Sequence, residues 1–243
     1  MVSPTSILRH LPPQLNSKQA LFLDGIRHAV EIAQFAYGRL EKTLTDLALH
    51  EPTGSANPDA FTSAFLDAWA FVDAVDRFRC LWKLMPGVQI LSPPPNDPMF
   101  RRLKEPIREL RNIADHLAQR AEYVVASRGA ALGVLTWCTF TDDEGNSGVS
   151  CALLPGTIAS ASVKLVNPAD ETAQITKTGR IHLEAGEYRA CLSNILPELE
   201  LRISEIEEQL ETQLGAAGLE GQQAGSDCFI AMRFTSVEPP IAG

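Results

Sequence analysis

One pattern of apolar residues constrains the fold more than any other feature of the sequence. From Ser17 to about His50, apolar side chains recur at alternating steps of three and four residues. An α-helix turns about 100° per residue, so this spacing places them on one helix face. The stretch therefore predicts a long amphipathic helix capped by Asn16 or Ser17. Its predicted apolar face consists of Phe22, Ile26, Ala29, Ala33, Tyr37, Leu40, Leu44 and Leu47.

Two further helices are predicted, each started by a polar cap followed by a proline. Asn57 and Pro58 begin the second helix, and Asp97 and Pro98 begin the third, which is predicted to run to about Ser127. A kink or break is expected in the third helix near Glu105, because Pro106 lacks an amide donor. The second helix carries a bulky apolar face whose burial should dominate the stability of this half: Phe61, Phe65, Ala68, Trp69, Val72, Val75, Phe78, Leu81 and Trp82.

After Gly129 the apolar pattern changes to that of strands and ends in one more helix. Residues 133–140 and 149–154 flank the turn-forming sequence DDEGNSG and predict a β-hairpin. An acidic helix follows from Ser193 to about Leu214, with Pro197 in its first turn. The other predicted strands are 162–166, 180–183 and 188–192, the last two joined by the turn EAG.

These elements predict an α+β fold, mainly α: a helical bundle with a small antiparallel sheet and a C-terminal helix. Residues 1–16 are expected to be a flexible leader, and residues 17–128 a helical domain. Residues 129–214 are expected to form a strand-rich subdomain whose acidic helix packs back on the bundle, and residues 215–243 a tail. The CFIAMRF stretch of that tail is interpreted as a docked strand, a partner-binding peptide or an unstructured end.

Charge and motifs exclude several classes of protein. A formal charge of −9 over 243 residues argues against broad nonspecific adhesion to nucleic acid, and no DNA binding is expected. The charge is uneven, since residues 100–111 hold five basic and two acidic side chains whereas residues 197–211 hold six glutamates and one arginine. No apolar run is long enough for a membrane span, no histidine or cysteine spacing fits a metal site, and no glycine-rich phosphate loop is present. We therefore expect no membrane, metal or cofactor.

The five cysteines indicate reduced thiols, and the protein is expected in the cytoplasm. Their number is odd, and they form no CxxC pair. Cys138, Cys151 and Cys191 alternate with apolar residues on predicted strands. Small buried thiols are expected there rather than nucleophiles.

The stretch RNIADH, Arg111 to His116, is the main candidate for chemistry. On one helix, Arg111 and His116 diverge by roughly 140° around the axis, so a joint site needs a kink or a second copy of the chain. An imidazole can transfer a proton at a ribose hydroxyl, and a guanidinium can hold phosphate oxygens. A purely structural alternative pairs Arg111 with Asp115 and Asn112 with His116 on a solvated face.

RNIADH resembles the signature of the HEPN superfamily, helical domains that carry an arginine, a polar residue and a histidine late in the bundle. Residues 71–87 (FVDAVDRFRCLWKLMPG), LRNIADHLAQR and GVLTW also resemble bacterial proteins of unknown role that append strands to such a bundle. The resemblance covers about residues 17–137. It implies a homodimeric, metal-independent endoribonuclease of toxin or defence type, with RNA as substrate and an antitoxin or other protein as partner.

Roles follow from this resemblance for individual residues. Arg111 would clamp the phosphate, His116 would act as acid or base, and Asn112 would support them. Some family members are noncatalytic, which implies the alternative of a dimeric helical interaction module in which Arg111 and His116 only decorate a helix. A rim that tracks the RNA backbone is expected, by position rather than by motif, at Arg101, Arg102, Lys104 and Arg108.

Overall fold

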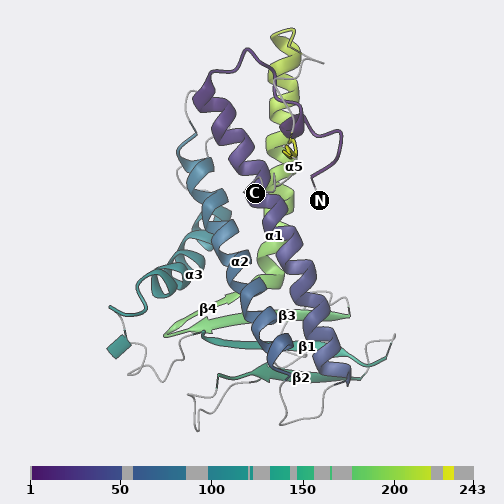
Figure 1. Ribbon diagram of the computed structural model, residues 1–243, viewed down its shortest axis with the longest axis vertical. Helices are drawn as coiled ribbons and strands as arrows, with labels where there is room; N and C mark the ends of the chain where they lie inside the picture. The colour runs from purple at the N-terminus through teal and green to yellow at the C-terminus, as the bar shows by residue number, and fades with distance from the viewer. Residues whose placement is uncertain are drawn as a thin grey trace, which may run out of the picture.

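The chain folds as an α+β protein, mainly helical, with a small antiparallel sheet at one end of the helices (Figure 1). The computed structural model describes residues 2–50, 57–85, 98–119, 121–122, 132–142, 147–155, 165, 177–219 and 227–232, with only the backbone for residues 98–104. The helices are α1 (Ser17–His50), α2 (Pro58–Lys83), α3 (Pro98–Asp115) and α5 (Leu192–Ala216). The strands are β1 (Val134–Phe140), β2 (Gly148–Leu153), β3 (Thr178–Ala185) and β4 (Tyr188–Cys191). No helix in these ranges is long and apolar enough to cross a membrane.

Helices α1 and α2 pack against each other and form the centre of the core. The predicted caps are confirmed: Asn16 Oδ1 accepts from the Gln19 amide at 2.9 Å, and Asn57 Oδ1 accepts from the Asp59 amide at 3.0 Å. Most of the predicted apolar positions are buried, and five are only partly covered: Phe22, Leu47, Phe61, Trp69 and Leu81. The side chains buried between the helices include Ile26, Val30, Ala33, Leu40, Phe65, Ala68, Phe71, Val72, Val75 and Phe78.

The sheet has the strand order β2-β1-β3-β4, with all neighbours antiparallel. The predicted hairpin is confirmed, since Leu135 of β1 pairs with Leu153 of β2. The first strand of the second hairpin ends two residues later than predicted: Ala185 still pairs with Tyr188, and Gly186 adopts a φ of 60°, which suits glycine. The predicted strand at 162–166 lies outside the described residues, apart from Leu165.

Helix α5 begins directly after β4 and packs beside α1 (Figure 1). Ser193, in its first turn, connects three elements: its hydroxyl accepts a hydrogen bond from Tyr37 Oη of α1 and another from the Ile181 amide of β3, both at 2.9 Å. Burial raises the pKa of Tyr37 to about 12. Pro197 was predicted in the first turn of this helix. Because α5 starts at Leu192, Pro197 lies beyond the first turn instead.

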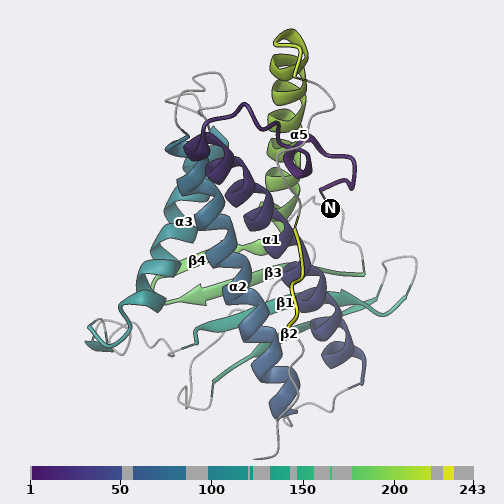
Figure 2. The same ribbon diagram turned by 45° about the horizontal axis from the view of Figure 1, so that its top comes forward.

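Helix α3 lies beside α2, above β4 (Figure 2), and differs from the prediction in two ways. Of the kink or break expected near Glu105, the break is wrong, because the helix continues through Pro106. It also ends at Asp115 rather than near residue 127. Burying the completely covered Ile107 and Leu110 contributes about 1.5–3 kcal/mol each, which offsets the roughly 3 kcal/mol cost of an interior proline. Residues 116–119 form turns, and residues 121 and 122 are again helical and are exposed.

The segment before α1 packs on the bundle, which corrects the expectation of a flexible leader. Ile7–Arg9 form a short 3-10 helix, in which Leu8 is only 1% exposed. The Ser6 hydroxyl donates a hydrogen bond to the Glu207 carboxylate of α5. Val2 and Leu11 are buried as well, and Arg9 forms an ion pair with Glu31 of α1, so apolar and polar contacts together dock the segment on α1 and α5.

Replacing Leu8 with alanine should therefore destabilise the protein by about 2–4 kcal/mol, because it removes a fully buried leucine. The measurement is the free energy of unfolding in urea. Leu21→Ala is the matched control, because Leu21 of α1 is 67% exposed and its loss should change stability by less than about 0.5 kcal/mol. Equal effects of the two substitutions would show that the leader is not part of the core.

Candidate functional site

Arg111, the expected phosphate clamp, points toward α2 and is held by carboxylates. Its Nη1 atom donates to Asp76 Oδ2 at 2.7 Å. Its Nε atom lies 3.3 Å from Asp73 Oδ1 and 3.5 Å from Asp115 Oδ2. The Asp115 contact is the i,i+4 pair of the structural alternative. The hydrogen bond to Asp76 raises the pKa of Arg111, against an opposing effect of burial.

Asp76 is the centre of this cluster. It is only 4% exposed, and its Oδ1 atom accepts a hydrogen bond from Arg79 Nε at 2.7 Å while Oδ2 accepts from Arg111. A buried carboxylate without such partners would be strongly unfavourable. Arg79 comes from α2 and Arg111 from α3, so the shared carboxylate joins the two helices.

The charge of the cluster does not favour a bound phosphate. Three carboxylates, from Asp73, Asp76 and Asp115, surround two guanidiniums. A phosphate bound by Arg111 would approach all three carboxylates and would compete with Asp76 for the best-aligned donor. The arrangement is suited to holding α3 on α2.

Asn112 and His116 lie elsewhere around α3. Asn112 Nδ2 donates to Glu109 Oε2 at 3.3 Å. His116 follows the last residue of the helix, where its amide donates to the Asn112 carbonyl at 3.2 Å and its side chain is exposed. Within the described part of the chain, no contact brings the side chains of Arg111, Asn112 and His116 together.

The expected RNA-binding rim is described only in part. Arg108 is exposed on α3. The backbone of residues 101, 102 and 104 belongs to α3, but the side chains of Arg101, Arg102 and Lys104 lie outside the described part of the structure.

Sequence reasoning gave no role to Asp73 and Asp76, although they decide how Arg111 is used. The sequence did contain a sign of this role. Asp76 follows the apolar position Val75 within the predicted apolar face of the second helix, and Arg79 comes three residues later. Such an acid needs a cation from a neighbouring element. Which element supplies that cation is tertiary information.

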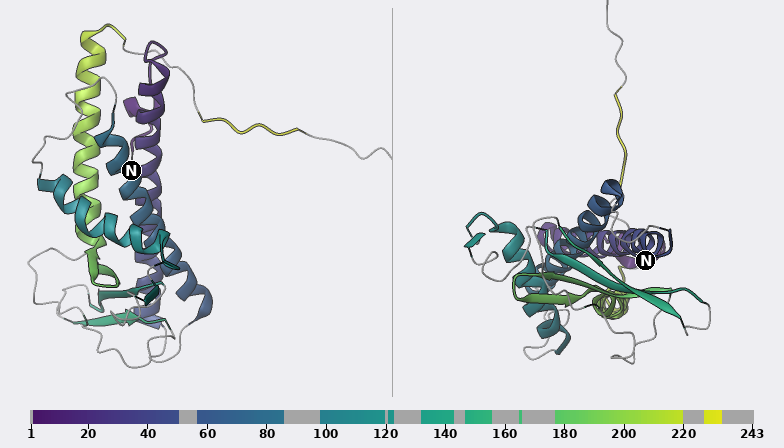
Figure 3. Two further views of the ribbon diagram at one scale, coloured as in Figure 1. Left: turned by 90° about the vertical axis from the view of Figure 1, so that its left-hand side faces the viewer. Right: turned by 90° about the horizontal axis from the view of Figure 1, so that it is seen from below.

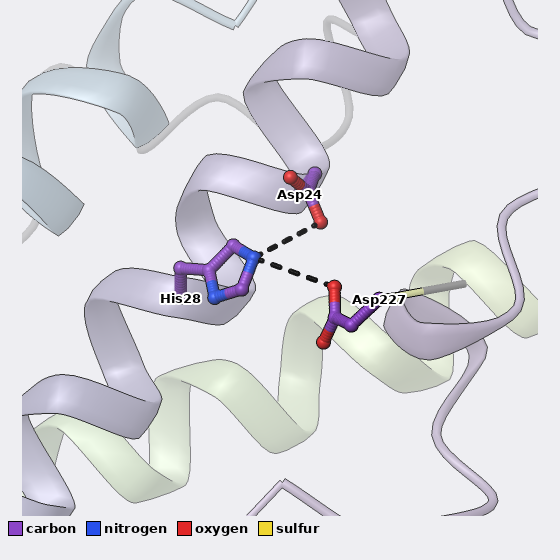
Figure 4. Close-up of side chains that lie close together, drawn as sticks. All are labelled: Asp24, His28 and Asp227. Atoms are coloured by element: carbon purple, nitrogen blue, oxygen red, sulfur yellow. Dashed lines mark ion pairs between the residues drawn. The ribbon is translucent and has the colours of Figure 1, made fainter. Parts of the chain in front are cut away.

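A second polar cluster surrounds Arg27 of α1, which is only 3% exposed. Figure 4 shows three other members of this cluster, Asp24, His28 and Asp227. Its guanidinium donates to Asp24 Oδ1 at 2.8 Å and to both carboxylate oxygens of Asp227, at 2.8 and 2.9 Å. Asp227 comes from the C-terminal tail. His28 Nε2 lies 3.6 Å from Asp24 Oδ1 and 3.8 Å from Asp227 Oδ1.

The same cluster holds the one group of metal-ligating side chains found among the described residues: Asp24, His28 and Asp227. Their ligand atoms lie within 4.8 Å of one another. However, the Arg27 guanidinium already binds the carboxylate oxygens that a cation would need. A divalent ion would also be repelled by that buried positive charge. The chemistry of this donor set therefore fits an ion-pair network rather than a metal centre.

A groove of about 550 Å³ lies between α1 and α2, next to the Arg27 cluster. Ile32 and Phe35 of α1 and Leu66 of α2 line it and are exposed. Its wall also contains Asp67, whose carboxylate is buried and lies 3.2 Å from Arg39 Nε. Burial raises the pKa of Asp67. The groove offers apolar surface with acceptor groups at its wall.

No family model matches the chain, and neither the curated proteins nor the solved structures compared with it gave a match. The resemblance to the HEPN superfamily and the roles that it implies therefore stay predictions.

Replacing Asp76 with alanine should cost about 3–5 kcal/mol of folding free energy, because it leaves two guanidiniums without their buried partner. Asp115→Ala is the control. Asp115 also faces Arg111 but is more than half exposed, so its loss should cost less than about 1 kcal/mol. Urea unfolding of both variants measures the difference, and equal losses would contradict a structural role for the buried pair.

Proposed function

We propose that this chain is a noncatalytic helical interaction module whose α1/α2 groove receives an apolar protein segment. The single observation that carries the proposal is the binding of the Arg111 guanidinium by Asp73, Asp76 and Asp115. That guanidinium serves in joining α3 to α2. A phosphate clamp would instead need guanidinium donors that are directed at the phosphate oxygens.

The groove between α1 and α2 supports the second half of the proposal. Ile32, Phe35 and Leu66 expose large apolar side chains on two adjacent helices, and the groove lies between them. Grouped apolar exposure of this kind is typical of interaction surfaces rather than of a solvated helix face. The basic and acidic side chains at its rim, Arg9, Arg39 and Glu31, suit a protein segment better than a nucleic acid backbone.

Exposure of His116 favours a second candidate function, metal-independent cleavage of RNA by a homodimer. His116 and Arg108 both present exposed side chains toward the end of α3. In that function a second copy would supply the opposing groups across a two-fold axis. Arg111 would then have to exchange Asp76 for phosphate when RNA binds.

An RNA-cleavage assay separates the two functions. We expect the purified full-length chain, incubated with single-stranded RNA in EDTA, to cleave no faster than a His116→Ala variant, because its arginine is engaged by carboxylates. Fragments are quantified on denaturing gels over time.

His50→Ala is the matched control, since His50 is also an exposed histidine at the end of a helix. A trace nuclease contaminant would act equally in all three samples. Cleavage that is lost in His116→Ala but kept in His50→Ala, with unchanged circular dichroism, would establish the ribonuclease function and end the present proposal.

A further inference from the structure

The C-terminal tail is anchored directly beside the groove. Both carboxylate oxygens of Asp227 accept hydrogen bonds from the buried guanidinium of Arg27, at 2.8 and 2.9 Å. Arg27 is followed on α1 by His28 and Glu31, which line the groove. A bidentate ion pair to a buried arginine fixes both the position and the direction of the chain at this point. Figure 4 shows Asp227 meeting α1 at this cluster.

The residues after this anchor are apolar and exposed. Phe229, Ile230 and Met232 are 92%, 86% and 87% exposed, and the segment runs away from the helices (Figure 3). The free energy falls when large apolar side chains move from water onto an apolar surface. The anchor and the exposed segment are adjacent in sequence, so the anchor holds these side chains close to α1.

The segment is long enough to reach the groove. Along α1, the eight residues from Arg27 to Phe35 span about 12 Å at 1.5 Å per residue. In an extended chain Phe229 lies about 7 Å beyond Asp227, Ile230 about 10 Å and Met232 about 16 Å. A rotation about the backbone next to Asp227 therefore brings Phe229 and Ile230 over Ile32, and Met232 as far as Phe35, while the Arg27 pair stays intact.

The groove also provides hydrogen-bond acceptors for an extended segment. Gln34 Oε1 is buried at its wall and accepts no hydrogen bond from the described residues, and Asp67 Oδ2 is buried there beside Arg39 Nε, 3.2 Å away. An extended peptide presents backbone N–H groups that need acceptors. The volume of about 550 Å³ falls within the range of about 300–1,000 Å³ of sites that bury compact ligands, which is enough for two or three apolar side chains.

We propose that the segment from Cys228 to Met232 is the occupant of its own chain's α1/α2 groove, with Asp227 and Arg27 as the hinge of a strap. This inference rests on the proposed function in that it uses the same groove. The short tether gives the segment a millimolar effective concentration at the groove. An external partner segment must displace it, so the strap sets which partners bind.

Site-specific photo-crosslinking in the full chain tests this directly. The photoreactive amino acid p-benzoylphenylalanine replaces Phe229, a dilute sample is irradiated, and the crosslinked peptides are mapped by mass spectrometry. We expect crosslinks to α1 and α2 residues of the groove within a band of monomer size. Asp227→Asn should lower the yield severalfold, because it weakens the hinge without changing the apolar side chains.

Leu66→Ser and Leu201→Ser are the matched pair of groove and control variants. Both residues are exposed leucines on helices, at 60% and 63%, but Leu201 is on α5, away from the groove lining. We expect Leu66→Ser to lower the groove crosslink at least fivefold and Leu201→Ser to leave it unchanged, with equal helicity by circular dichroism. A yield that Leu66→Ser does not change would overturn the proposal.

Crosslinks between two chains would also overturn it, since they would assign the groove to the tail of a second copy. None of these outcomes depends on RNA cleavage. The crosslinking experiment can therefore contradict the strap even if the chain cleaves no RNA. If the chain does cleave RNA, the crosslinks still test the strap independently.

Discussion

A buried carboxylate at Asp76 is the constraint on which the arrangement of α3 depends. Removing this charge from water is costly unless cations and hydrogen bonds compensate it. Arg79 of α2 supplies one guanidinium and Arg111 of α3 supplies the other. With Arg111 fixed on α2, Ile107, Leu110 and Ile113 of α3 turn into the core. The residue that most suggests chemistry in the sequence thus has a structural role in the account proposed here.

The helices and hairpins could be predicted because their signals are local. The three-and-four spacing along α1 and the Asn57–Pro58 start of α2 specify helices without reference to the rest of the chain. The β1–β2 hairpin follows equally from a turn sequence between two apolar stretches. The antiparallel sheet and the C-terminal helix followed from the same local patterns, although a HEPN-type bundle is not established by them.

The remaining features could not be read from local patterns because tertiary contacts decide them. Pro106 is tolerated in α3 because the neighbouring apolar residues are buried, and Leu8 docks the leader because α1 and α5 provide a surface for it. In the candidate site, the spacing of Arg111 and His116 correctly indicated that one helix does not join them. The pairing of Arg111 with Asp115 was also predicted, but its partners on α2 were missed, since Asp73 and Asp76 are 38 and 35 positions away in the chain.

Two arginines, Arg111 and Arg27, are each bound by several carboxylates, and in both cases the contacts join segments distant in sequence. A double-mutant cycle of Asp76→Ala and Arg111→Ala, measured by urea unfolding, tests the central claim most directly. We expect a coupling energy of about 1–3 kcal/mol. Additivity of the two substitutions within about 0.5 kcal/mol would contradict the account, because Arg111 would then be free to hold a phosphate.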